Sequence, residues 1–111
     1  MARRLVLSLT DDARGFRSAV VSHEHVTLGA FLETGVGHPS HREFLSLRAA
    51  AVDALASGSS DDYTGDAFFV DFEGLETRIR CLYNDDLDLT IPTEDFVAAL
   101  DVYADYWATD I

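Results

Sequence analysis

The sequence predicts an α+β fold, in which an antiparallel sheet of three to five strands carries helices packed on one face. Three observations favour it. Apolar and polar residues alternate along 68–91, which is the period of strands with one buried face. Segments 44–55 and 96–107 each repeat apolar residues every three or four positions, as amphipathic helices do. The length of 111 residues suits one domain, residues 1–111.

The first 35 residues predict two strands and a short helix. Leu5, Leu7 and Leu9 alternate along 3–9, which indicates an opening strand, and 10–15 is expected to form a turn. A second strand is expected within 16–26. Thr27 is placed to cap a short helix over 28–33 that ends at Gly35, but across 16–33 the pattern leaves strand and helix both open.

A capping box predicts that a longer helix starts at Ser40. Its hydroxyl can accept the Glu43 amide hydrogen, while the Glu43 carboxylate reaches back to the Ser40 amide. Gly58 is expected to end this helix in a left-handed conformation. The apolar stripe consists of Phe44, Leu47, Ala51 and Leu55.

A strand meander is predicted after a polar loop at 59–65. Its strands are 68–72, 75–83 and 87–91, with bends at Gly74 and at Asn84-Asp85-Asp86. Leu75, Tyr83 and Cys81 belong to the predicted inward row. On the outward face, Arg78 and Arg80 are expected to pair across strands with Asp71, Glu73 or Asp88.

A second amphipathic helix is predicted at the C-terminus, with Thr93 as its N-cap. At 100° per residue its apolar stripe consists of Phe96, Leu100, Tyr103 and Trp107. Its opposite face carries Glu94, Asp101 and Asp105. We expect the apolar stripe to pack on the meander.

Negative charge is concentrated in the second half of the chain. Residues 59–111 contain fourteen Asp and Glu against two Arg, which gives −12, whereas residues 1–58 contain six acids against six Arg, which gives zero. Such a surface repels nucleic acid and anionic membranes and attracts cationic proteins. Solubility alone would account for net charge but does not require its segregation. We therefore expect a basic protein partner and no direct contact with nucleic acid or membrane.

No metal or cofactor site is predicted. The histidine pairs are His23-x-His25 and His38-x-x-His41. Zinc needs a third and usually a fourth ligand, and no cysteine pair or HExxH helix supplies them. A calcium loop is partly matched by Asp62, Thr64, Asp66 and Glu73. The glycine required at its bend is replaced by Ala67.

No catalytic residue is predicted either. The sequence has no G-x-S-x-G elbow, and Gly35-Val36-Gly37 is followed by His38-Pro39 rather than by the remainder of a phosphate-binding loop. Cys81 is expected on a strand's inward face, where a thiol is inert. These absences favour a binding protein over an enzyme.

The candidate contact residues are acidic side chains at the ends of the predicted meander and on the open helix face. They are Asp61, Asp62, Asp66, Asp85, Asp86, Asp88, Glu94, Asp101 and Asp105. Carboxylates would steer a cationic partner and set its register. Aromatic side chains such as Tyr63, Phe69 or Tyr106 are expected to anchor the interface.

The order of these elements resembles small acidic bacterial immunity proteins of polymorphic-toxin and contact-dependent inhibition systems. The similar features are segment 27–33, the helix that ends at Gly58, the strand meander, and segment 91–107 with Leu100, Tyr103 and Trp107. The resemblance implies a stoichiometric inhibitor that covers the active site of a toxin, often a basic nuclease. No contact residue is carried over from the family.

Two other classes stay open. An accessory subunit, or a homodimer joined through an edge strand, would use the same sheet. A small-ligand or enzyme domain would need a concave pocket. The apolar run near the N-terminus stops at Thr10-Asp11, too early for a signal peptide, and the single cysteine suits a reducing compartment, so we expect a cytoplasmic protein.

Overall fold

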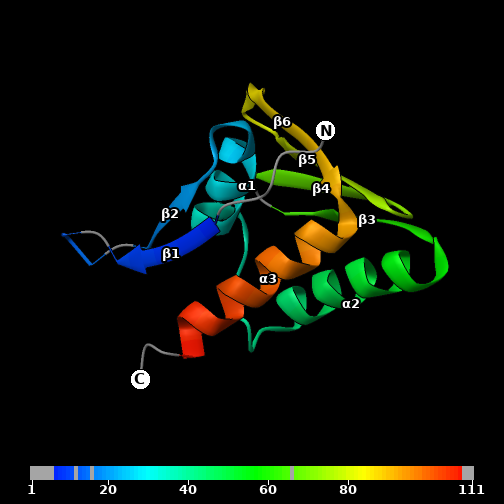
Figure 1. Ribbon diagram of the computed structural model, residues 1–111, viewed down its shortest axis with the longest axis horizontal. Coiled ribbons are helices and arrows are strands. Elements are labelled where there is room, and N and C mark those ends of the chain that lie inside the picture. The colour runs from blue at the N-terminus through cyan, green and yellow to red at the C-terminus, as the bar shows by residue number, and fades with distance from the viewer. Residues whose placement is uncertain (1–6, 12, 16, 66, 109–111) are drawn as a thin grey trace.

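The computed structural model describes residues 7–11, 13–15, 17–65 and 67–108, and these form the predicted α+β fold (Figure 1). A four-stranded antiparallel sheet has the order β3-β4-β5-β6. Its strands are β3 (Ser60–Thr64), β4 (Phe68–Glu73), β5 (Glu76–Cys81) and β6 (Asn84–Pro92). Every neighbouring pair is antiparallel, because the chain passes from each strand directly to the next.

The N-terminal segment forms a separate two-stranded sheet and a short helical run. The strands are β1 (Leu7–Asp11) and β2 (Arg17–Val21), followed by η1 (His23–His25), α1 (Val26–Ala30) and the π-helical turn η2 (Phe31–Gly35). Of the two alternatives left open for 16–33, residues 17–21 form a strand and residues 26–35 are helical. Thr27 lies buried inside α1 rather than capping it. Leu5, which was predicted to lie in the opening strand, is outside the described residues.

The long helix α2 (Arg42–Ser57) begins one residue later than predicted, with His41 rather than Ser40 at the N-cap, and the capping box is wrong. The Ser40 amide donates to His38 Nδ1 at 3.1 Å, and the Ser40 hydroxyl also meets this atom, at 2.8 Å. A nearby imidazole thus takes the place of the Glu43 carboxylate. The end of the helix is confirmed, because Gly58 is left-handed with φ of 72°.

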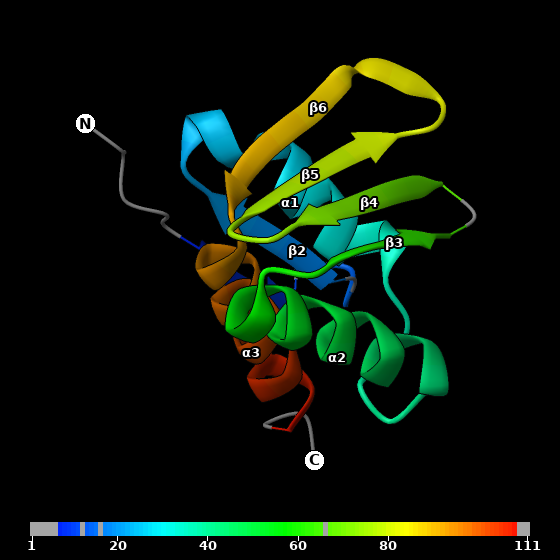
Figure 2. The ribbon, with the colours of Figure 1, turned by 90° about the vertical axis from the view of Figure 1, so that its right-hand side faces the viewer.

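The core lies between the four-stranded sheet and the helices that cover one of its faces (Figure 2). Helix α3 (Thr93–Ala108) contributes the predicted stripe, of which Phe96, Leu100 and Tyr103 are fully buried. Phe96 meets Phe72 of the sheet edge-on, with ring centroids 5.5 Å apart. Burial of each such side chain stabilises the fold by roughly 1.5–3 kcal/mol.

Thr93 was expected to cap α3, but it is the first residue of the helix and is fully buried. Its hydroxyl donates to the Gly74 carbonyl oxygen at 2.8 Å. Because that proton is used, the Thr77 hydroxyl donates to Thr93 Oγ1 at 2.9 Å. The residue ties the start of α3 to the β4–β5 turn.

Two predictions in the meander are wrong. The polar segment at 59–65 contains strand β3, whose residues pair with β4 from Ser60↔Glu73 to Thr64↔Phe69. The β5–β6 turn lies at Leu82-Tyr83, not at Asn84-Asp85-Asp86. The Asn84 side chain accepts the Asp86 amide at 3.0 Å, so the polar triplet forms an irregular start of β6 after the turn.

The inward row also ends earlier than predicted. Thr77 and Ile79 are buried and Cys81 is half-buried, but Leu75 is 67% exposed and Tyr83 is 82% exposed. Both exposed residues lie outside strand β5, in the connections at its two ends. The alternation of a strand stops where its pairing stops, which explains the difference.

Candidate protein-binding face

One face of the β3-β4-β5-β6 sheet is covered by helices, and no described element covers the other (Figure 2). We call the uncovered side the open face. Strand register brings its residues into cross-strand rows. The rows are Thr64–Phe69–Arg80–Asp88, Asp62–Asp71–Arg78–Thr90 and Ser60–Glu73–Glu76–Pro92. They confirm the prediction of a meander with one apolar and one largely charged face.

Carboxylates of the open face lie directly opposite one another. Asp62 pairs in register with Asp71, and Glu73 pairs with Glu76. We call these four residues the acidic patch. Like charges opposite each other on neighbouring strands destabilise a sheet. Sheet stability therefore gives no reason for this arrangement.

The acidic patch is not neutralised by hydrogen bonds or close ion pairs within the described chain. Arg78 is the cation nearest to it, but its guanidinium is engaged by Asp88 through Nε at 2.9 Å and Nη2 at 2.6 Å. The hydrogen bond from Arg78 holds the pKa of Asp88 below its usual range. Arg80 lies over the Phe69 ring, 5.4 Å from its centroid. The expected cross-strand pairing of Arg78 with Asp88 is thus present.

The predicted contact residues divide between two sides of the molecule. Asp62 and Asp88 lie on the open face, Asp61 lies on the edge strand β3 in the cross-strand row of the buried Phe72, and Asp85 and Asp86 follow the β5–β6 turn. Glu94, Asp101 and Asp105 are exposed on α3, which lies on the covered side of the sheet (Figure 1). Asp66 falls outside the described residues. These nine acids therefore do not form one continuous surface.

Asp101 differs from the other helix-face acids because it has a cationic partner. Its Oδ1 accepts Arg48 Nη2 of α2 at 3.0 Å. This ion pair joins two neighbouring helices and partly neutralises the helix face. The open face is the more strongly unbalanced of the two surfaces.

Three residues of the acidic patch were missed as contact residues. The sequence indicates Asp71 and Glu73 only as cross-strand partners for Arg78 and Arg80, and it places Glu76 beside these arginines on the outward face of the same strand. Their clustering depends on strand register, which the sequence did not define because β3 had been predicted as a loop. The outward alternation in 68–76 was the available signal.

The predicted aromatic anchors are half-buried, whereas an unpredicted one is exposed. Tyr63, Phe69 and Tyr106 each retain only intermediate exposure, but Tyr83 is 82% exposed at the β5–β6 turn, beside Leu82 at 48%. We call Leu82-Tyr83 the hairpin tip. The Leu82 amide donates to the Ala67 carbonyl oxygen at 2.7 Å, which fixes the tip to the neighbouring hairpin. An exposed and positioned tyrosine is a typical interface anchor.

The free edge of β3 is protected against pairing with another strand. The bonds Gly65 N–Phe68 O and Gly74 N–Ser59 O show that alternate residues bond to β4, which turns the Asp62 amide towards the open edge. The Asp61 carboxylate accepts that amide at 2.8 Å. A self-satisfied amide flanked by two negative charges disfavours addition of a strand.

Other reactive side chains have structural partners. His25 is buried, and its Nδ1 lies 2.5 Å from the Ser22 hydroxyl. Across the described residues, no three His, Cys, Asp or Glu side chains converge as metal ligands, and no helix is long and apolar enough to cross a membrane. Cys81 is half-buried and makes no disulfide.

Scans against protein-family models, curated proteins and solved structures found no match. The open face and the hairpin tip are the features of the described chain that best suit a binding function. Chemically, this combination can attract a cationic surface through the carboxylates and bury an aromatic anchor in it.

Proposed function

We propose that this chain is a non-enzymatic inhibitor that binds a cationic protein through the open face of its four-stranded sheet. The resemblance to bacterial immunity proteins supports the more specific proposal that the partner is a basic toxin and that the chain covers its active site in the cytoplasm. The acidic patch would meet Lys and Arg side chains, and the hairpin tip would enter an adjoining hollow of the partner.

The observation that carries this proposal is the like-charge register of Asp62 with Asp71 and of Glu73 with Glu76. Such pairs lower the stability of the isolated chain. A cationic partner that relieves this repulsion is therefore bound with a more favourable free energy than it would be by the same number of scattered carboxylates. The net charge of −12 on residues 59–111 also favours a cationic partner.

A homodimer formed through sheet edges is the competing function, but two observations disfavour it. Asp61 and Asp62 would place four carboxylates together if β3 paired with β3 of a second copy. At the other edge, β6 ends in Pro92, which has no amide hydrogen to donate. Pairing of two acidic open faces would meet the same repulsion.

Purification of the tagged chain from its native host, followed by identification of what binds it, tests the proposal. The expected partner is a protein of high isoelectric point that binds with one-to-one stoichiometry and loses activity in the complex. Binding should weaken steeply as salt concentration rises, since exposed charges are screened over about 8 Å at physiological ionic strength. An acidic partner, or binding that is insensitive to salt, would contradict the proposal.

A further inference from the structure

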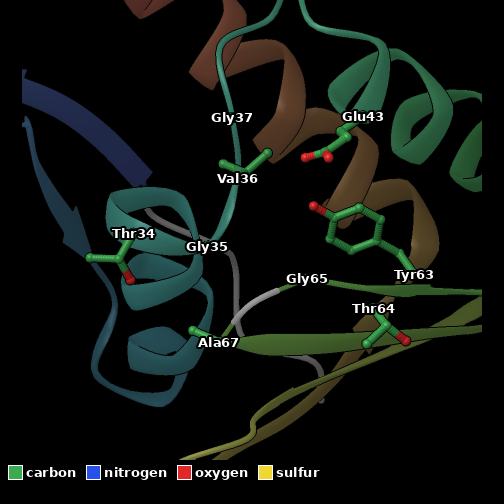
Figure 3. Close-up of a pocket in the computed structure, with 9 residues that line it drawn as sticks. All are labelled: Thr34, Gly35, Val36, Gly37, Glu43, Tyr63, Thr64, Gly65 and Ala67. Carbon is green, nitrogen blue, oxygen red and sulfur yellow. The ribbon is translucent and has the colours of Figure 1, made fainter.

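A pocket of about 360 Å³ lies where the start of α2 approaches the β3–β4 hairpin, and of its lining residues only Thr64 belongs to an open-face row (Figure 3). Its volume falls within the range of about 300–1,000 Å³ that is usual for small-molecule sites. The lining comes from the end of η2 and the segment after it, the first turn of α2, the end of β3 and the β3–β4 connection. Its principal polar side chains are Glu43 and Tyr63.

Glu43 is available for a ligand because its expected partner is occupied. The Ser40 amide, which a capping box would direct to Glu43, donates to His38 Nδ1 instead. In the described chain Glu43 makes no hydrogen bond or ion pair, and it is the one charged residue among those lining the pocket. The described residues that line the pocket therefore carry one negative charge and no positive charge.

Tyr63 supplies an aromatic surface next to that charge. Its side chain is half-buried against the core and extends across Gly65, where an added Cβ would lie 3.3 Å from the tyrosine hydroxyl oxygen. The Glu43 carboxylate and the Tyr63 hydroxyl point towards the same space beside Val36 (Figure 3). A carboxylate beside a ring matches a planar cation, which can stack on the ring and donate two hydrogen bonds to the acid.

We propose that this pocket binds a guanidinium group, with Glu43 as its counter-ion and the Tyr63 ring as its stacking surface. The group could belong to a free small molecule or to an arginine side chain of a protein, and the chemistry of recognition is the same. A guanidinium is favoured over an ammonium because it is planar and less strongly hydrated. The site contains no residue of the acidic patch or of the hairpin tip, so it does not depend on the proposed function.

Amide NMR spectra of the full chain, titrated with three probes, test this site. The probes are agmatine, acetyl-Gly-Arg-Gly-amide and acetyl-Gly-Lys-Gly-amide. Saturable shifts are expected at the Gly35, Gly37 and Gly65 amides, which line the pocket. The expected dissociation constants lie in roughly the millimolar range, because the carboxylate is exposed. Tighter binding of agmatine than of the arginine peptide indicates a free ligand, and the reverse order indicates a protein side chain.

Glu43→Gln removes the charge while keeping the shape, and it should weaken the binding of both guanidinium probes about fivefold. Glu94→Gln is the matched control, since it removes one charge from an exposed helix position outside the pocket. Tyr63→Leu should weaken binding as well, provided that its NMR spectrum remains that of the folded chain. Absence of saturable shifts with both guanidinium probes, equal binding of the lysine peptide, or an unchanged affinity in Glu43→Gln would overturn the proposal.

Discussion

Arg17 Nη1 donates to the hydroxyl of Tyr103 at 3.1 Å, although the two residues are 86 positions apart. The same guanidinium donates through Nη2 to the Glu33 carbonyl oxygen at 2.6 Å and lies 5.0 Å from the centroid of the Tyr103 ring. The hydroxyl of Tyr103 is also 2.8 Å from the Gly37 carbonyl oxygen, to which it donates. These contacts join β2, η2 and the following segment to α3.

Tyr103→Phe should lower the free energy of unfolding by about 1–3 kcal/mol. The change removes one oxygen atom but leaves Arg17 Nη1 and the Gly37 carbonyl oxygen without this partner in a poorly hydrated site. Urea denaturation followed by circular dichroism measures the effect. Tyr83→Phe is the matched control and should change stability little, because Tyr83 is 82% exposed. Equal stability of the two variants would show that the Tyr103 hydroxyl is not a structural junction.

Arg78→Leu should raise the pKa of Asp88 towards its ordinary value, because the hydrogen bond from Arg78 is the main cause of its depression. A depressed carboxyl pKa contributes stability above the unfolded value of 3.8, and that stability is lost as pH falls through the folded pKa. The carboxyl carbon shift of Asp88 in an NMR titration reports the change.

Arg80→Leu is the control for that titration, because Arg80 acts on Asp88 only through its charge and is the smallest contributor. Its effect on the Asp88 pKa should be smaller than that of Arg78→Leu. An equal effect of both substitutions would mean that charge alone, without the hydrogen bond, sets the Asp88 pKa.

Replacing the hairpin tip, Leu82-Tyr83, by Asn-Gly should weaken partner binding at least about tenfold without lowering stability. Asn and Gly both tolerate the negative φ angles that Leu82 and Tyr83 adopt, and the change removes apolar surface from water. Binding is measured by calorimetry with the purified partner, and stability by thermal unfolding. A large loss of stability with intact binding would assign the tip a folding role instead.

Asp61→Val combined with Asp62→Thr should make the chain self-associate. The changes remove the carboxylate that occupies the Asp62 amide and both charges at the β3 edge. Light scattering at increasing protein concentration measures the effect. Glu94→Thr with Asp105→Val, on exposed positions of α3, changes the same charge and serves as control. A variant of the β3 edge that stays monomeric would show that another feature protects this edge.

The fold class was predictable because burial imposes a period on each element. Phe68, Val70 and Phe72 alternate, and Phe96, Leu100 and Tyr103 repeat at helical spacing, so the face that each element buries could be identified. Strand β3 has no such period, since four of its five residues are exposed, and its pairing partner alone defines it.

The predictions of the capping box and of the β5–β6 turn were wrong because each sequence segment allows two local arrangements. Both Glu43 and His38 can satisfy the Ser40 amide, and the structure selects His38. Similarly, Asn84-Asp85-Asp86 has the composition of a turn, but pairing of Cys81 with Asn84 leaves Leu82-Tyr83 at the bend. The acidic patch depends on register across three strands, which no single segment encodes.

The most direct test of the open face is the association rate of its charge-reversed variant with the native cationic partner. Glu73→Lys with Glu76→Lys reverses two charges but keeps like charges opposite each other, so the repulsion within the sheet is preserved. Glu94→Lys with Asp105→Lys makes the same change in net charge on α3. The account predicts that the open-face variant associates at least about tenfold more slowly at low salt and loses most of its salt dependence, while the α3 variant changes much less. Equal slowing by both variants, or greater slowing by the α3 variant, would contradict it.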